Sequence, residues 1–453
     1  MKRYIKRMTG VILTLILFIS CQENEHGIVD LTPPEAKSEY VYNHPCAMYS
    51  QQDFTRVKTM LDNGSAPQAV IDEFQNLKNS QYAMLTYIPN PQSQIVRGDP
   101  KGTDYSSENY AIAMRDAAAA YQQALLWKLT GDDNYASSAI KILNGWAATC
   151  KKVTSNDANH FLAAGAQGYT FANAGEILRD YTGWSEADFD KFKTWMVDVF
   201  AERNYAFLTK HSNTVNTHYW ANWDLVNMAS YLAIGILTEN NDMVSYIIDY
   251  FHNGAGNGCL ERLIVDTHTN PLSSGETIAQ SQESGRDQGH ASMVVSVAAN
   301  LCQMAYTMHL NNTDVPELDF FAAKDNAILK MGEYTALFNL KNGTDNSNSS
   351  GSWLISVVAM PFTRYERLYT VGNGTSTEVH TQASEQQRGT IRPGWEIIYN
   401  HYSKVKNLPS GYTYSKQFAD KLRPEGGASD NRYGPNSGAF DQLGWGTLMM
   451  YQQ

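Results

Sequence analysis

Pairs of helical segments joined by short polar turns occupy the chain from about residue 108 to about residue 340. Apolar residues recur there with the period of an α-helix, and turn signals such as Gly131-Asp132-Asp133 separate the members of a pair. The expected pairs are 117–130 with 135–150, 163–181 with 186–208, 222–237 with 243–252, and 291–310 with 322–340. Antiparallel helix pairs build either an open solenoid or a closed ring. Because no repeat of fixed period accompanies them, the pattern predicts an all-α fold, an (α/α) toroid in one large domain.

The first residues have the features of an export signal. A basic stretch within residues 2–7 precedes an apolar run at 11–19, which is too short to span a bilayer. Ser20-Cys21 ends this run as a bacterial lipobox does, so we expect Cys21 to carry lipid. The predicted organisation is therefore a lipoprotein signal peptide at 1–21, an exported linker at 22–45 and the toroid at 46–453. The expected location is the periplasm or the outer-membrane surface, with the lipid as the anchor.

Charge and cysteine spacing exclude several functions. A formal net charge of −11 argues against nucleic acid, which requires a basic surface. An anionic substrate would have to be met by a local basic cleft, and arginines do concentrate after residue 360. The cysteines other than Cys21 have no metal-binding or CxxC spacing; a disulfide at Cys46 is possible, without a nameable partner.

A dense polar run at 282–290 leads directly into an apolar helical stretch. On a helix, Glu283, Arg286, Asp287 and His290 would share one face. Each glycine inside a helix costs about 1 kcal/mol relative to alanine, so two glycines in this run are unusual for a purely structural helix. The run is either a solvated helix start with an ion-pair ladder or the polar end of an active-site helix.

A second polar cluster precedes the helix expected at 222–237. It contains Asn213, Asn216, His218, Tyr219, Trp220 and Asn222. Both clusters would then lie at helix N-termini on a common rim. His218 and Asn222 would be neighbours if the segment were helical. Metal ligation is the weaker interpretation, because the histidines lack HxxxH or HxH spacing; no metal or cofactor is predicted.

Asparagine, histidine, arginine and a phenol together suit eliminative cleavage of a uronic-acid polysaccharide. Amide and guanidinium donors neutralise the carboxylate, which makes the C5 proton acidic. A neutral histidine or a tyrosinate then removes that proton, and a tyrosine protonates the departing O4. In mannuronan and glucuronan these two positions lie on the same side, so one tyrosine can serve as base and acid. In guluronan they lie on opposite sides, which suits a histidine base and a tyrosine acid.

At these residues the chain resembles the alginate-lyase-like polysaccharide lyases of α/α-toroid fold. Asn216-Thr217-His218 and Trp223-Asp224 are similar to the motif that starts a helix in family 5 alginate lyases. Segments 118–146, 163–179, 392–402 and 433–443 look like those of family relatives, so the resemblance covers most of residues 105–450. The nearest group is polysaccharide lyase family 38, which includes mannuronan and glucuronan lyases.

The resemblance implies roles for individual residues. Asn216 would help neutralise the carboxylate, His218 would be the base or its partner, and Arg286 would assist neutralisation, with His290 as an auxiliary. The family 5 pattern has a catalytic tyrosine two turns after the arginine, where this chain has Ser292 and Met293. Tyr433 is the preferred replacement among several tyrosines. The expected substrate-binding residues are Gln167, Asn213, Tyr219, Trp220, Asn222, Glu283, Tyr365, Arg392 and Tyr399.

Two other functions fit the same sequence. A glycoside hydrolase on the same toroid would use two facing carboxylates drawn from Glu283, Asp287, Glu396 and Asp441. A non-catalytic glycan-binding lipoprotein would use some of the 27 tyrosines and 9 tryptophans as a stacking platform. The expected partner in each case is a polysaccharide, anionic for the lyase.

Overall fold

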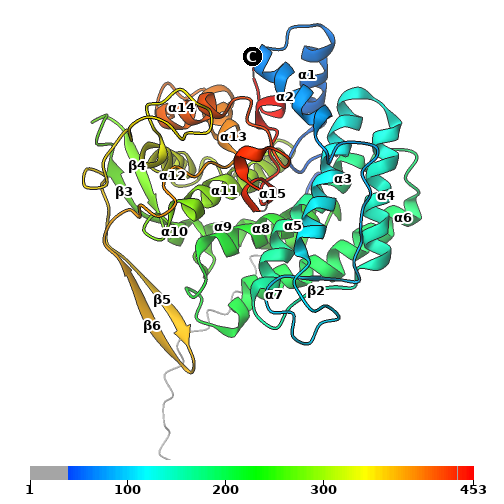
Figure 1. Cartoon of the computed structure of the whole chain (residues 1–453), viewed down its shortest axis with the longest axis horizontal. Helices are drawn as coiled ribbons and strands as arrows, with labels where there is room; N and C mark the ends of the chain where they lie inside the picture. Colours follow the sequence, from blue (N-terminus) through cyan, green and yellow to red (C-terminus); the bar gives the residue numbers. More distant parts are fainter. Residues whose placement is uncertain (1–38, 436, 453) are drawn as a thin grey trace, which may run out of the picture. The chain divides into compact units, whose positions relative to one another are not determined.

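The computed structural model describes residues 39–435 and 437–452, which belong to one compact unit (Figure 1). Cys21 and the predicted signal peptide lie outside the described residues. Within them, no helix is both long enough and apolar enough to cross a membrane.

An inner series of helices, each packed against the next, forms the centre of the fold (Figure 1). The series comprises α3 (Tyr110–Thr130), α5 (Asn159–Leu178), α8 (Ala221–Leu237), α11 (Gln288–His309) and α13 (Trp395–Asn400). The short α16 (Gly446–Met449) contacts α13 and also α2 (Gln68–Asn79), and α2 in turn contacts α3. Because α5, α8 and α11 are buried on nearly all sides, their sequences are apolar all round rather than striped.

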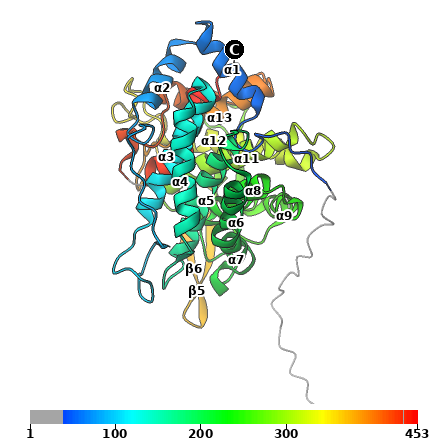
Figure 2. The same ribbon diagram turned by 90° about the vertical axis from the view of Figure 1, so that its right-hand side faces the viewer.

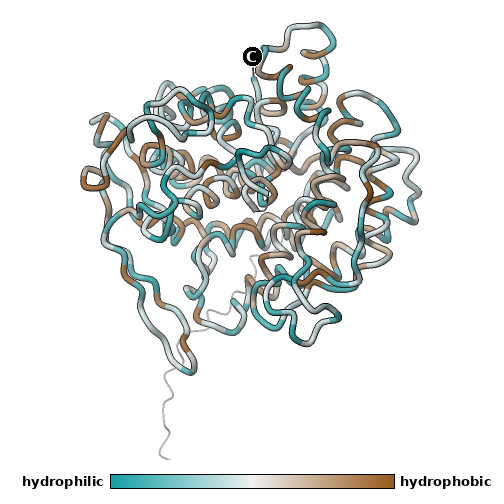
Figure 3. The backbone as a smooth tube through the Cα atoms, in the orientation of Figure 1, coloured by the Kyte–Doolittle hydropathy of each residue, from teal (hydrophilic) through white to brown (hydrophobic). Residues whose placement is uncertain are grey.

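An outer series of helices covers the inner one. It comprises α4 (Asp133–Thr149), α6 (Glu186–Met196) continued through η1 (Val197–Ala201) and α7 (Glu202–Lys210), α9 (Asn241–Asn253), α12 (Ala323–Asn339) and α14 (Thr413–Leu422). Helix α4 pairs with α3, α9 with α8, and α12 with α11. The exposed residues of α4 and α9 are mostly polar, whereas the inner helix α8 is largely apolar along its length (Figure 3). The predicted helix pairs and the all-α toroid are therefore confirmed.

The close contact of α5 with α8 depends on small residues. A Cβ atom on Gly165 would lie 2.6 Å from Val226, and one on Gly168 would collide with Ser230. Glycine at these positions lets the two backbones approach closely, which fixes where α8 begins and hence where its N-terminal residues point.

Short strands and turns connect the helices. Strand β1 (Gln94–Val96) pairs in parallel with β2 (Lys152–Thr154), β3 (Ile264–Thr269) pairs with β4 (Thr277–Ser281), and β5 (Tyr365–Val371) pairs with β6 (Gly374–His380), the last two pairs being antiparallel. The remaining elements are α1 (Gln51–Asp62), η2 (His211–Asn213), α10 (Leu260–Leu263), η3 (Pro316–Leu318), η4 (His401–Val405), η5 (Asn431–Tyr433) and α15 (Ser437–Phe440). The β5–β6 hairpin projects away from the helices in both views (Figure 1, Figure 2).

Candidate active site

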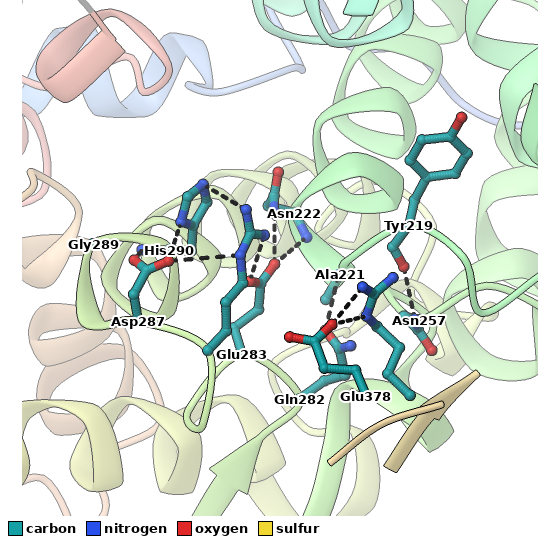
Figure 4. Close-up of polar contacts among 12 residues, drawn as sticks. Tyr219, Ala221, Asn222, Asn257, Gln282, Glu283, Asp287, Gly289, His290 and Glu378 are labelled. Carbon is teal, nitrogen blue, oxygen red and sulfur yellow. Dashed lines mark hydrogen bonds and ion pairs between the residues drawn. The ribbon is translucent and has the colours of Figure 1, made fainter. Parts of the chain in front are cut away.

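The N-termini of α8 and α11 meet through the side chains of the polar run that precedes α11. Gln282 Oε1 accepts a hydrogen bond from the backbone N–H of Ala221 at 3.0 Å, and Glu283 Oε1 accepts one from that of Asn222 at 3.0 Å (Figure 4). The first N–H groups of a helix lack partners within the helix and carry partial positive charge, so the carboxylate of Glu283 is well placed there. The two polar clusters of the sequence therefore lie side by side, as expected.

Most of each cluster precedes its helix, contrary to the helical interpretation of the sequence. Residues 282–287 form a turn, and α11 begins only at Gln288, with Asp287 as its N-cap accepting from the backbone N–H of His290 at 2.9 Å. Aspartate favours this position because its side chain satisfies a free N–H group. Likewise His218 lies in a turn before α8, so His218 and Asn222 are not helical neighbours.

Later segments of the chain explain the two glycines of this run. A Cβ atom on Gly285 would lie 2.6 Å from the Cβ of His380 on β6, and one on Gly289 would collide with the side chain of Gln387. The glycines thus allow close packing of the 380–388 region against the site, instead of weakening a helix.

Arg286, Asp287 and His290 form a connected chain of polar contacts (Figure 4). Arg286 Nη1 donates to Glu283 Oε2 at 3.0 Å, and its Nη2 lies 3.2 Å from His290 Nε2. His290 Nδ1 lies 2.7 Å from Asp287 Oδ2. Burial alone would raise the pKa of Asp287, but its contacts with His290 and Arg286 outweigh burial and hold that pKa below its usual value.

These contacts determine which nitrogen of His290 carries the proton. An ionised Asp287 can only accept, so Nδ1 of His290 must donate. Arg286 can only donate, so Nε2 presents its lone pair. His290 is therefore a neutral imidazole, oriented by a carboxylate, with the lone pair of Nε2 next to a guanidinium.

Trp220 connects this group to the β5–β6 hairpin. The guanidinium carbons of Arg286 and Arg367 lie 4.9 Å and 4.4 Å from the centre of its ring. Arg367 is held by Glu378 of β6 at 2.6 Å and also donates to the backbone oxygen of His218. Arg367 and Glu378 could not be selected from the sequence, beyond the general concentration of arginines in this part of the chain.

His218 has the opposite tautomer from His290. Its Nδ1 accepts a hydrogen bond from the backbone N–H of Thr370 on β5 at 2.9 Å, so in the neutral ring the proton lies on Nε2. Burial, and next the positive charge of Arg367, lower the pKa of His218, which favours this neutral form. His218 can therefore donate from Nε2 but cannot use Nδ1 as a base.

The predicted tyrosines differ in how their hydroxyl groups are used. Tyr433 is buried and donates its hydroxyl proton to the backbone oxygen of Glu425 at 2.6 Å. The hydroxyl oxygen of Tyr365 instead accepts a hydrogen bond from Gln282 Nε2 at 2.9 Å, and the same Gln282 side chain accepts from the first N–H group of α8. Tyr399 lies on α13 against Lys416 and not with the cluster around Arg286. Of these three, Tyr365 is the one joined to that cluster by a hydrogen bond.

The other predicted binding residues are distributed around this centre. Asn222 is buried and donates from Nδ2 to Glu283, whereas Asn213 and Asn216 are exposed. Tyr219 is half-buried against Trp223. Gln167 is buried on α5.

Arg392 links the C-terminal region to the site. Its Nε donates to the backbone oxygen of Gly289 at 3.1 Å, and its Nη1 lies 3.5 Å from Asp441. Burial raises the pKa of Asp441 above its usual value, and the positive charges of Arg392 and Arg97 only partly oppose this effect. Asp441 was considered as a hydrolase carboxylate, but it lies in this basic environment near His290.

The carboxylates required for a glycoside hydrolase are each paired with a cation. Glu283 and Asp287 both pair with Arg286, Glu396 pairs with Arg423, and Asp441 pairs with Arg392. A pair of carboxylates facing each other across a free space is the requirement of hydrolysis. These ion pairs therefore favour elimination over hydrolysis.

Comparison with known proteins gives one family match and several structures of similar fold. Residues 63–261 match the family described as alginate lyase, and no curated protein sequence matches the chain. Alginate lyase A1-III from Sphingomonas species A1 has a similar structure over 90% of this chain and 99% of that chain, with a TM-score of 0.52 and 12% identity. A histidine-to-alanine variant of alginate lyase A1-III complexed with a tetrasaccharide has a TM-score of 0.52 and 12% identity. The similarity covers 90% of this chain and 98% of that chain. An alginate lyase from Bacteroides ovatus has a TM-score of 0.50 and 12% identity, over 83% of this chain and 96% of that chain. The structural likeness is one of fold.

Proposed function

We propose that this chain is an alginate-lyase-like polysaccharide lyase that cleaves alginate or a related β-1,4-linked uronan by β-elimination, giving 4,5-unsaturated oligosaccharides. Support for the substrate comes from the alginate lyase family match and from the tetrasaccharide bound by a lyase of the same fold. Its placement in polysaccharide lyase family 38 stays a prediction.

The observation that carries the proposal is the position of a basic nitrogen beside a guanidinium. His290 Nε2 carries the lone pair of the ring, and Arg286 Nη2 lies 3.2 Å from it. A uronate carboxylate bound by Arg286 would bring the adjacent C5 carbon close to that nitrogen. Arg286 would then turn from His290 toward the substrate, which leaves Nε2 free to take the C5 proton.

The remaining groups complete an elimination. His218 Nε2–H is a second donor for the carboxylate, and Asn216 stays a predicted amide donor from the exposed loop. Burial raises the pKa of Tyr365, so its phenol is protonated at neutral pH and has a proton to give to the departing O4. In this assignment His290 is the base, whereas the sequence favoured His218.

The products of alginate-type polymers test the reaction directly. We expect ultraviolet absorbance from the new C4–C5 double bond with poly-mannuronate or poly-guluronate, measured in parallel with glucuronan and heparinoids. Reducing ends that form without this absorbance would mean hydrolysis and would refute the proposal. Binding without turnover on every uronan would support the glycan-binding alternative.

Two tyrosine variants distinguish the candidate acids. Tyr365→Phe is expected to lower kcat by about 10²–10³-fold, in the range of general acid catalysis. Tyr433→Phe, the matched control, is expected to leave kcat nearly unchanged and to cost about 1 kcal/mol of stability, because it loses one hydrogen bond to a backbone carbonyl. Initial rates and thermal melts of both variants check this. The reverse ranking of the two rates would make Tyr433 the acid.

We further propose that the protein is an exported lipoprotein attached to the outer membrane through Cys21, in contact with its polymeric substrate. The basic, apolar and Ser20-Cys21 segments of the sequence support this location. Cys21→Ser is expected to abolish incorporation of radiolabelled palmitate and to move the protein from the membrane fraction to the soluble fraction. Equal labelling of wild type and variant would rule out lipidation at this residue.

A further inference from the structure

A histidine, a cysteine and a glutamate converge where the segment before α1 packs on the C-terminal turns of α5. His44 Nδ1, Cys46 Sγ and Glu176 Oε1 all lie within 4.8 Å of one another. Sγ lies 3.5 Å from Nδ1, and Nδ1 lies 2.5 Å from Oε1. Cys46 is fully buried, whereas 15% of the His44 side chain is exposed to solvent. The group is separate from the residues assigned to elimination.

We propose that His44, Cys46 and Glu176 bind one zinc ion. Imidazole nitrogen, thiolate sulfur and carboxylate oxygen are the ligands that zinc takes in proteins. With a Zn–S bond of about 2.3 Å and a Zn–N bond of about 2.0 Å, two corners of a tetrahedron lie about 3.5 Å apart. The observed Sγ–Nδ1 distance matches this edge. Glu176 must withdraw by about 1 Å to admit the ion.

Surrounding charges hold each ligand in the orientation that a metal requires. His44 Nε2 lies 3.1 Å from Glu239 Oε1, so with zinc on Nδ1 the other nitrogen donates its proton to a carboxylate. This carboxylate–histidine–metal arrangement is the usual support for a metal-bound imidazole. Arg179 binds Glu176 Oε2 at 3.1 Å and Glu239 Oε1 at 3.0 Å, which leaves Glu176 Oε1 directed at the site.

The charges also balance with the ion in place. Zinc carries two positive charges and Arg179 one, against a thiolate and the carboxylates of Glu176 and Glu239. Without an ion, His44 lies between two carboxylate oxygens, one on each of its ring nitrogens, and bridges them by hydrogen bonds. That metal-free hydrogen-bonded group is the alternative that the experiment must exclude. The exposed edge of His44 provides the path for the ion and for a water molecule as the fourth ligand.

Zinc titration of the full-length mature protein tests the site without any polysaccharide. After treatment with a chelator, calorimetry should give one zinc per chain, and added zinc should raise Tm. Cobalt in place of zinc should show a thiolate-to-metal charge-transfer band. Cys46→Ser should remove the band and weaken zinc binding by at least about tenfold, and Glu239→Gln should weaken it by about 10–100-fold.

Cys150→Ser is the matched control, because Cys150 is equally buried and its Sγ contacts the backbone oxygen of Lys152 rather than a histidine or a carboxylate. It should keep both the cobalt band and the zinc affinity. Circular dichroism verifies that each variant folds. Zinc binding by wild type that equals that of Cys46→Ser, or the lack of any stoichiometric binding by wild type, overturns the proposal and leaves the hydrogen-bonded group.

Discussion

Replacing His290 by alanine is expected to lower kcat by about 10²–10⁴-fold, the range that a positioned general base contributes. KM should change much less, because His290 acts on the C5 proton while Arg286 binds the carboxylate. Asp287→Asn should lower kcat as well, since an amide can donate to Nδ1 and reverse the tautomer of the ring. Initial rates over a range of substrate concentrations separate kcat from KM.

A histidine remote from the site provides the control for this prediction. His252 lies on α9 with Nε2 3.0 Å from the backbone oxygen of Glu317, so His252→Ala should leave the rate unchanged. His218→Ala should raise KM more than it lowers kcat, because it removes a donor to the carboxylate. Loss of turnover in His218→Ala with activity retained in His290→Ala would contradict the assignment and restore His218 as the base.

Glu283→Ala is expected to destabilise the protein by about 3 kcal/mol. The side chain is fully buried, and its removal leaves Arg286 and two N–H groups of Asn222 without their acceptor. Removal of one partner from a buried ion pair costs about 3–5 kcal/mol, and the lower end applies because a quarter of the Arg286 side chain is exposed. Urea denaturation of both proteins measures the difference.

An exposed glutamate gives the reference for that measurement. Glu202 lies on the solvent side of α7, so Glu202→Ala should change stability by no more than about 0.5 kcal/mol. The loss of stability in Glu283→Gln should lie between those of Glu283→Ala and Glu202→Ala. The amide oxygen still accepts from Asn222, but the negative charge that pairs with Arg286 is lost. Equal midpoints for Glu283→Ala and Glu202→Ala would show that Glu283 does not hold α8 and Arg286 together.

The helical architecture could be predicted because it is encoded locally. Periodic apolar residues and turn signals placed α4 and α8 within a few residues of their observed bounds. The strand pairs were missed because β3 and β5 are short and carry polar residues on both faces, so no alternating pattern distinguishes them from loops. For β3 and β4, the contact with α12 is a further feature that their own sequence does not show.

The composition of the site could be predicted better than its geometry. The runs around His218 and around Arg286 were recognised, and both lie at the α8 and α11 termini. The prediction that Glu283 and His290 share one face of a helix was wrong. Asp287 is the N-cap of α11, so Glu283 lies in the turn before the helix and His290 lies in its first turn. The tautomer of His218 could not be foreseen, since it is set by Thr370, which lies 152 positions later in the chain.

The contacts of the β5–β6 hairpin with the loop before α8 have a consequence for engineering. Thr370, two positions before Gly372 of the turn, donates to His218, and Arg367, nearer the base of the hairpin, lies against Trp220. A graft that replaces the tip back to Thr370 would therefore release His218, whereas an exchange limited to Gly372 and Asn373 would keep both contacts. The site thus limits how much of the hairpin can be replaced.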